Sequence, residues 1–346
     1  MYKTLLKQTT EYEKITASLH SSGAAALFGI PAAGRALLYA AIAKETGRPL
    51  CIVTPGEAEA TRFAADLSTL GAAASVFPPR DFVLRPIEGT GREYEYRRLA
   101  VLGDLAGGRL QAVCVPAEAL LQYTMPKADF CANTLTLKPG MEYDQNTLMR
   151  RFYAAGYIRR AQVDGPGQFS VRGDIVDLYA PDMKQPVRIE YWGDEIDSIS
   201  SFDMLTQRRE DPLEKIYLSP AREVLFGDTA QTAESLRSWL AGHKSKKKTT
   251  LETVMAGDLA LLDSGSMPEA MDKYLGVRYP KPATILDHLD DPILILEEPC
   301  SIRDAQKATQ MRRDGEMEAL LEDGVLCPGL DQLYLDQTDL DRFVDQ

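Results

Sequence analysis

Several features that mark common enzyme classes are missing from this sequence of 346 residues. It has only three histidines, none with a partner at metal-ligand spacing, so zinc chemistry and histidine-based catalysis are not expected. Its five cysteines form no C-x-x-C pair, and Cys51 and Cys114 fall within apolar runs. This predicts buried thiols in a reducing cytoplasm rather than metal ligands.

Membrane segments and an excess of positive charge are also missing. The most apolar stretch, residues 23–43, is largely alanine and is interrupted by Pro31 and Arg35, and residues 1–20 carry too many charges for a signal peptide. The formal net charge of −12 disfavours DNA binding across the whole surface. We therefore expect a cytoplasmic protein without membrane contact, in which DNA contact needs a local basic patch.

Strand and helix patterns alternate over the first third of the chain. Short apolar runs predict strands at 24–30, 49–55, 74–78 and 112–116, and amphipathic segments predict helices at 35–46, 57–70 and 92–106. Strand, helix and strand in this order are typical of a parallel sheet with right-handed crossovers. Residues 78–91, rich in proline and glycine, predict a long loop.

The pattern changes near Pro126. A helix opened by Asp144 and closed by Gly156 is followed by strands, and Gly193-Asp194 predicts a two-residue hairpin turn. Further on, the sequence predicts helices at 231–242 and 301–322 and a buried strand within 290–299. The predicted fold class is α/β, in which a helicase-like parallel-sheet domain from two segments, 1–125 and 213–346, receives a mostly antiparallel α+β domain, 126–212. The acidic end carries no closing structural signal, and we expect the chain to be part of a longer protein.

The segment from Gly29 to Gly34 has the glycine spacing of a phosphate-binding loop. An active loop continues with Lys and Ser or Thr, but here Arg35 and Ala36 stand in those places, and Pro31 lacks a backbone donor. Without a hydroxyl at position 36, Mg²⁺ loses a ligand that phosphoryl transfer needs. We predict a degenerate nucleotide site, no bound cofactor and no catalytic residue.

An acidic strand end completes this degenerate site. The apolar run at 293–296 leads into Glu297 and Glu298, the pattern of strand-terminal carboxylates that hold Mg²⁺ in active enzymes. A buried strand that continues into an acidic loop explains the same residues equally well.

Arginines are concentrated between residues 150 and 172, a segment that contains five arginines and only one acidic residue, Asp164. Strand alternation places Phe169 on one face and Ser170 and Arg172 on the other, with Gly173 permitting a bulge. If Phe169 packs inward, Arg172 points outward from a rigid sheet and suits recognition of a carboxylate on a protein partner. The lysine-rich run at 243–250 predicts a solvated loop.

Three stretches carry a resemblance to a known family: GYIRRAQVDGPGQFSVRGDIVDLYAP, VRIEYWGDEIDSISSFDMLTQR and LSPARE. They resemble the N-terminal UvrB-like region of the bacterial transcription-repair coupling factors (Mfd), and the flanking segments agree along nearly all of the chain. The resemblance implies a helicase-like domain split by an inserted domain that docks UvrA. It also implies that contacts with RNA polymerase and DNA belong to domains downstream of this region.

The resemblance assigns the UvrA contact to Arg159, Phe169 and Arg172. Ser170 stands where UvrB itself usually has Arg, and residues 78–95 are too short for the DNA-binding hairpin of UvrB. Arg160 stands where the family more often has an apolar residue, which leaves its role open. These departures favour a coupling factor.

Two functions of different class follow. The first is a non-catalytic docking module that recruits UvrA in nucleotide excision repair. The alternative is an active UvrB-type DNA-dependent ATPase or helicase, against which Arg35 and Ala36 argue. Direct DNA binding through the run at 243–250 is a third interpretation.

Overall fold

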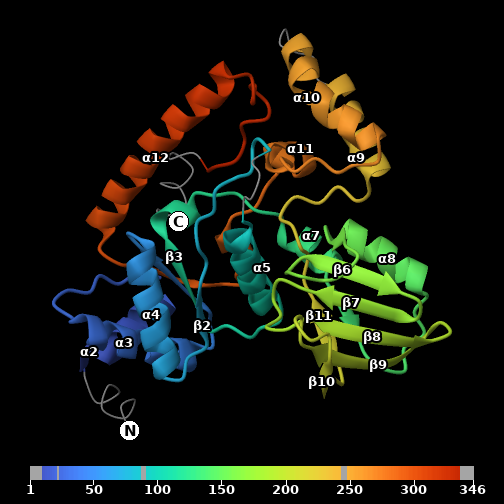
Figure 1. Ribbon diagram of the computed structural model, residues 1–346. Coiled ribbons are helices and arrows are strands. Elements are labelled where there is room, and N and C mark those ends of the chain that lie inside the picture. The colour runs from blue at the N-terminus through green and yellow to red at the C-terminus, as the bar shows by residue number, and fades with distance from the viewer. Residues whose placement is uncertain (1–9, 22, 87–90, 243–247, 336–346) are drawn as a thin grey trace. The chain divides into compact units, whose positions relative to one another are not determined.

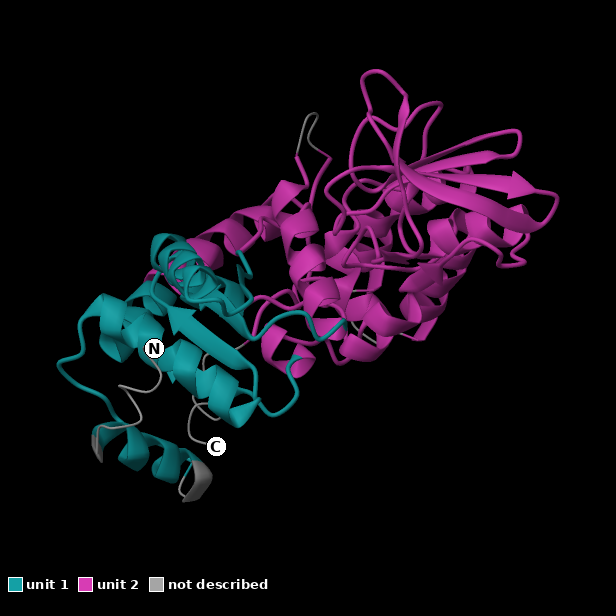
Figure 2. Cartoon of the chain, turned by 90° about the horizontal axis from the view of Figure 1, so that it is seen from below, with its two compact units in different colours: residues 1–78, 107–120, 289–307 teal, residues 79–106, 121–288, 308–346 magenta. Residues whose placement is uncertain are grey.

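A parallel sheet and an antiparallel sheet form the framework of the protein (Figure 1). The computed structural model describes residues 10–21, 23–86, 91–242 and 248–335. Chain contacts define two compact units (Figure 2). Unit 1 contains residues 1–78, 107–120 and 289–307, and unit 2 contains residues 79–106, 121–288 and 308–346. The α/β fold class is thus confirmed, while the division at 126 and 212 stays a prediction.

The parallel sheet of unit 1 has the strand order β12-β1-β3-β2. Leu50 lies beside Ala112 on one side and Ile293 on the other, so a strand from the end of the chain completes the sheet. Every residue of β1 and β3 is buried, as is usual where both faces of a sheet are covered. The predicted buried thiols Cys51 and Cys114 lie in these two strands. The strands are β1 (Leu50–Thr54), β2 (Ala74–Val76), β3 (Ala112–Pro116) and β12 (Ile293–Leu296).

Helices pack on this sheet through alanines and larger apolar side chains. Leu38 and Ile42 of α3 and Phe63 and Leu67 of α4 share one core with Leu50 of β1. Gly47 closes α3 in the left-handed conformation that glycine adopts without strain (φ 67°). The helices are α2 (Thr10–Ser21), α3 (Ala32–Thr46), α4 (Glu57–Thr69) and α6 (Ala117–Leu120).

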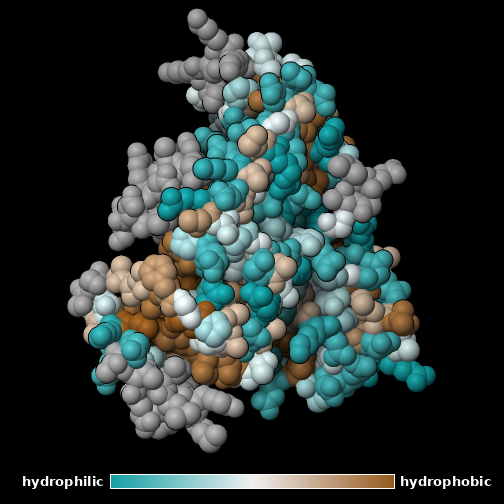
Figure 3. All heavy atoms as spheres, turned by 90° about the vertical axis from the view of Figure 1, so that its left-hand side faces the viewer, coloured by the Kyte–Doolittle hydropathy of each residue, from teal (hydrophilic) through white to brown (hydrophobic). Residues whose placement is uncertain are grey.

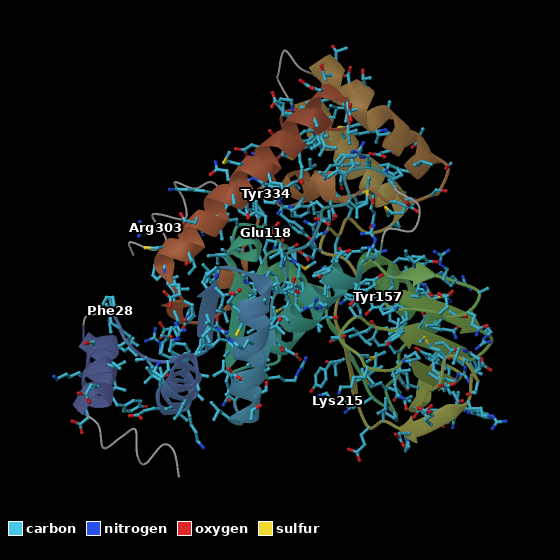
Figure 4. The ribbon with its side chains drawn as sticks, turned by 60° about the vertical axis from the view of Figure 1, so that its left-hand side comes forward. Phe28, Glu118, Tyr157, Lys215, Arg303 and Tyr334 are labelled. Carbon is cyan, nitrogen blue, oxygen red and sulfur yellow. The ribbon has the colours of Figure 1, made fainter. Side chains whose placement is uncertain are left out.

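The strand predicted at 24–30 is wrong. These residues form neither helix nor strand, and Phe28, labelled in Figure 4, is 89% exposed. The three alanines at 24–26 offer little apolar area to bury, and alanine is disfavoured in strands, which accounts for the failure of the pattern.

Figure 3 shows apolar residues gathered in the lower left of one face of the molecule.

The antiparallel sheet of unit 2 has the order β10-β9-β8-β7-β6-β5. Only its edge pair, β5 with β6, is parallel. Gly193 adopts a φ of 62° in the turn between β8 and β9, so the predicted hairpin is confirmed. The strands are β5 (Ile158–Arg159), β6 (Gln168–Arg172), β7 (Ile175–Tyr179), β8 (Val187–Trp192), β9 (Glu195–Phe202) and β10 (Arg209–Pro212).

One face of this sheet packs on helix α8 (Gln145–Ala154). The Asp144 side chain caps that helix by accepting a hydrogen bond from the Thr147 N–H, as predicted. Leu148 and Phe152 of α8 share a core with Phe169, Leu178 and other side chains of alternate strand positions. A second pair, β4 (Leu135–Leu137) with β11 (Ile216–Leu218), adds to the same core.

Two local expectations in this unit are corrected. Gly173 forms no bulge but lies with Asp174 in the two-residue turn between β6 and β7, because Arg172 pairs directly with Ile175. The first strand predicted after Gly156 is limited to Ile158–Arg159, and the loop that follows it is bonded to the sheet through the Ser170 hydroxyl, which donates to the Ala161 carbonyl oxygen.

The remaining helices lie mostly in unit 2. Helix α10 was not predicted, whereas α5, α9 and α12 were, and the predicted lysine-rich loop falls largely on residues 243–247, outside the described part. Among the described residues, no helix is long and apolar enough to cross a membrane. The helices are α5 (Glu93–Ala106), α7 (Lys127–Ala132), α9 (Thr229–Gly242), α10 (Lys248–Asp263), η1 (Asp272–Tyr274), α11 (Leu275–Arg278), η2 (Ile285–His288) and α12 (Pro299–Glu322).

A buried network of charged side chains ties distant segments of unit 2 together. Arg98 donates to both carboxylate oxygens of Glu223 at 2.7 and 3.2 Å, and Arg80 donates to Asp272 at 2.7 Å. Glu95 accepts the Glu223 backbone N–H at 2.9 Å. Burial by itself raises the pKa of Glu95, but the nearby arginines, with Arg80 foremost, lower it to about 2. The ionised form is therefore the one that stabilises the fold.

We predict that acid unfolding depends on Glu95. Because its pKa is lowered from 4.5 to about 2, the stability from its charge is complete above pH 4.5 and is lost as the pH falls toward 2. Urea unfolding at several pH values should show a steeper fall in the free energy of unfolding for the unaltered chain than for Glu95→Gln. Glu93→Gln, an exposed change on the same helix, should behave like the unaltered chain. Equal slopes for all three proteins would contradict this role.

Candidate functional site

The degenerate phosphate loop is largely helical. Helix α3 already begins at Ala32, so Gly34 lies in its first turn and the Arg35 N–H is bonded to the Pro31 carbonyl oxygen at 3.0 Å. A Cβ atom at Gly34 would come within 3.1 Å of the Ile30 side chain. Gly29 alone keeps a left-handed φ, of 74°. The glycine spacing therefore serves chain packing here, and the Arg35 N–H is not available to a phosphate.

The acidic strand end lies directly against this helix. One Nη atom of Arg35 is 2.6 Å from a Glu297 carboxylate oxygen and 3.0 Å from a Glu298 oxygen. Glu297 is buried and also accepts a hydrogen bond from the Tyr39 hydroxyl. Burial, together with Glu297, raises the pKa of Tyr39, which keeps the hydroxyl protonated as the donor. The structure thus brings together the residues assigned to the degenerate nucleotide site.

A guanidinium group is bonded to both carboxylates of the acidic strand end. In an active site the strand carboxylates hold Mg²⁺ and the loop hydroxyl supplies a further ligand. Here Arg35 neutralises Glu297 and Glu298, and Ala36 is buried and has no donor atom. The arrangement links α3 to the end of β12 and offers no metal ligand that is not already engaged by a cation.

The three residues assigned to partner docking lie in different environments. Phe169 is fully buried, with its ring 5.2 Å from those of both Phe152 and Tyr153. Its side chain packs in the core beneath β6, and its assignment as a contact residue stays a prediction. Arg159 and Arg172 are exposed.

Arg159 lies on the edge strand β5, where its register partner is Phe169. It lines a cavity of about 750 Å³ together with Tyr153, Tyr157 and Arg222. Tyr157, labelled in Figure 4, donates a hydrogen bond to the Ser219 carbonyl oxygen at 2.6 Å and so joins this region to the segment after β11.

Arg172 lies on the other side of the sheet, which we call the outer face. This face carries the side chains that alternate with the core positions, namely Ser170, Arg172, Ile175, Asp177, Arg188, Glu190 and Trp192. The Arg172 side chain is 48% exposed, and one of its Nη atoms is 2.6 Å from the buried Asp177 carboxylate. Because Phe169 packs inward, Arg172 points outward from the sheet, as predicted.

Comparisons with known proteins agree with this architecture. Residues 135–224 match the UvrB interaction domain family, which covers β4 through β11. The chain is similar to the transcription-repair-coupling factor of Bacillus subtilis (strain 168), with 29% identity over 93% of this chain and 28% of that protein. It is also similar to the transcription-repair-coupling factor of Myxococcus xanthus, with 31% identity over 91% of this chain and 27% of that protein.

These matches support a UvrB-like N-terminal region of a transcription-repair coupling factor. The chain spans just over a quarter of the length of these relatives. The part matched by the UvrB interaction domain includes both β5 and the whole outer face, so Arg159 and Arg172 lie within it.

Three further residues of this coupling-factor region were not predicted from the sequence. Asp177 and Arg188 pair across β7 and β8, and Trp192, 82% exposed, extends the outer face at the tip of the next hairpin. Strand alternation indicates the face on which each lies, but the ion pair depends on the register between two strands. Trp192 could have been identified from the sequence, because a tryptophan directly before the predicted turn at Gly193 is expected to be exposed.

We predict that Arg35→Ala destabilises the protein by about 1–3 kcal/mol, because Glu297 would remain buried without its cation. Arg62→Ala is a matched control, since the Arg62 and Arg35 guanidinium groups lie 5.6 and 5.8 Å from the Phe63 ring. Loss of that exposed cation–π contact should cost at most about 1 kcal/mol. Urea unfolding of both variants tests the difference, and an equal cost would show that the carboxylates do not need Arg35.

Proposed function

We propose that this chain is a non-catalytic docking module that recruits UvrA to sites of stalled transcription in nucleotide excision repair. Contacts with RNA polymerase and DNA are assigned by the same proposal to parts of the longer relatives that this chain does not span. The observation that carries the proposal is Arg172, an exposed cation held on a rigid strand within the UvrB interaction domain.

The outer face has the composition of a protein-binding surface. Arginine and tryptophan are enriched at binding hot spots, and Arg172 and Trp192 are both exposed on this face. Arg159 lies on the edge strand β5, next to β6, so a partner that covers the outer face and extends around this edge contacts both arginines. An interface of ordinary size, about 800 Å² on each protein, is wide enough for this.

The absence of catalysis is part of the proposal. The alternative of a UvrB-type ATPase needs a cation-free pair of carboxylates and a hydroxyl ligand for Mg²⁺. In this chain Arg35 is bonded to both carboxylates, and Ala36 has no hydroxyl. We assign this region a structural role in the scaffold that carries the docking domain.

Calorimetric titration of the chain with purified UvrA tests the proposal. We predict binding by the unaltered chain and a loss of about 2 kcal/mol or more, roughly 30-fold in Kd, for Arg172→Ala, because a partner carboxylate would lose its donor. Arg150→Ala is the matched control, since Arg150 is an exposed arginine on α8, away from the outer face. Circular dichroism checks that each variant is folded. No binding by the unaltered chain, or equal binding by Arg172→Ala, would contradict the proposal.

A further inference from the structure

The Asp177 side chain lies on the outer face, which is partly open to solvent. Asp177 itself is only 1% exposed. It accepts three hydrogen bonds from arginines: one from Arg172 at 2.6 Å and two from Arg188, at 2.7 and 3.0 Å. The three residues lie on adjacent strands, β6, β7 and β8. Two cations and one anion leave this cluster with an excess of positive charge on the outer face.

The two arginines depend on Asp177 to different degrees. Arg188 is also bonded to the Gln207 carbonyl oxygen at 3.2 Å, and its guanidinium lies 4.8 Å from the centre of the Phe202 ring. Within the described residues, Arg172 has only the bond from one Nη atom to Asp177. The loss of the Asp177 carboxylate would therefore release Arg172, while Arg188 would keep its other contacts.

Arg172 keeps hydrogen-bond donors that Asp177 does not use. Its Nε atom and its second Nη atom make no hydrogen bond with any described residue and can bind a further carboxylate. A long side chain that is already held in place loses less conformational entropy on binding than a mobile one.

We infer that Asp177 is a positioning residue for partner docking, which holds Arg172 extended over the outer face so that its remaining donors meet a carboxylate on an acidic surface of UvrA. This inference rests on the proposed function. Arg188 has a separate role, because its two hydrogen bonds hold the Asp177 carboxylate in place.

The inference and a simple attraction between charges predict opposite results for one substitution. Asp177→Asn makes the outer face more positive, so charge attraction alone would strengthen binding to an acidic partner. Positioning predicts weaker binding, by about five- to tenfold in Kd, because Arg172 becomes mobile. Asp197→Asn is the matched control, since it removes the same charge from an exposed position on β9 and should not weaken binding.

The experiment is calorimetric titration of UvrA with the unaltered chain, Asp177→Asn, Arg172→Ala and the double variant, with thermal unfolding as the check on folding. We expect Asp177→Asn to weaken binding in the unaltered chain and to have no further effect when Arg172 is already alanine. Unchanged or stronger binding by Asp177→Asn, with Arg172→Ala still weak, would overturn the inference and leave the proposed function standing. Asp177→Glu, which keeps the charge and moves it by one methylene, should bind better than Asp177→Asn and serves as the second variant if the latter does not fold.

A measurement without UvrA separates this inference from the proposed function. Nuclear spin relaxation of the Arg172 Nε–H group should show a rigid side chain in the unaltered chain, a mobile one in Asp177→Asn and an intermediate one in Asp177→Glu, which keeps the carboxylate. Equal mobility in the unaltered chain and Asp177→Asn would overturn the inference whether or not UvrA binds.

Discussion

Burial of a carboxylate costs several kcal/mol unless a cation lies within hydrogen-bonding distance, and the described residues meet that requirement repeatedly. Among them, Glu297 has Arg35 in unit 1, Glu223 has Arg98 in unit 2, and Asp177 has Arg188 on the antiparallel sheet. Each of these pairs joins segments that are separated in the sequence. Although the chain is acidic overall, these buried carboxylates are each paired with an arginine, which holds them in place.

The first of these pairs lies where the sequence predicts a degenerate nucleotide site. The guanidinium of Arg35 is bonded to both strand-end carboxylates and links α3 to the end of β12. The last pair is used differently, because Asp177 also holds Arg172, which remains half exposed. The same chemistry thus engages both carboxylates in one place and leaves donors available in the other.

Features set by neighbouring residues were predictable from the sequence. The Asp144 cap and the turn at Gly193 depend on a few positions each, and both are confirmed. The strand at 24–30 failed because apolar character in an alanine-rich run does not provide enough area for burial. The pairing of Asp177 with Arg188 needed the strand register, and the contact of Arg35 with Glu297 spans 262 positions, so neither follows from local pattern.

We propose that the outer face and the β5 edge of the antiparallel sheet dock UvrA. Hydrogen–deuterium exchange of the chain with and without UvrA tests this most directly, because it locates the contact without a substitution. We predict slower exchange in the turn between β6 and β7, in the tip between β8 and β9 and along β5, with unit 1 unchanged. Protection confined to unit 1 or to helices α9 and α10 would contradict it.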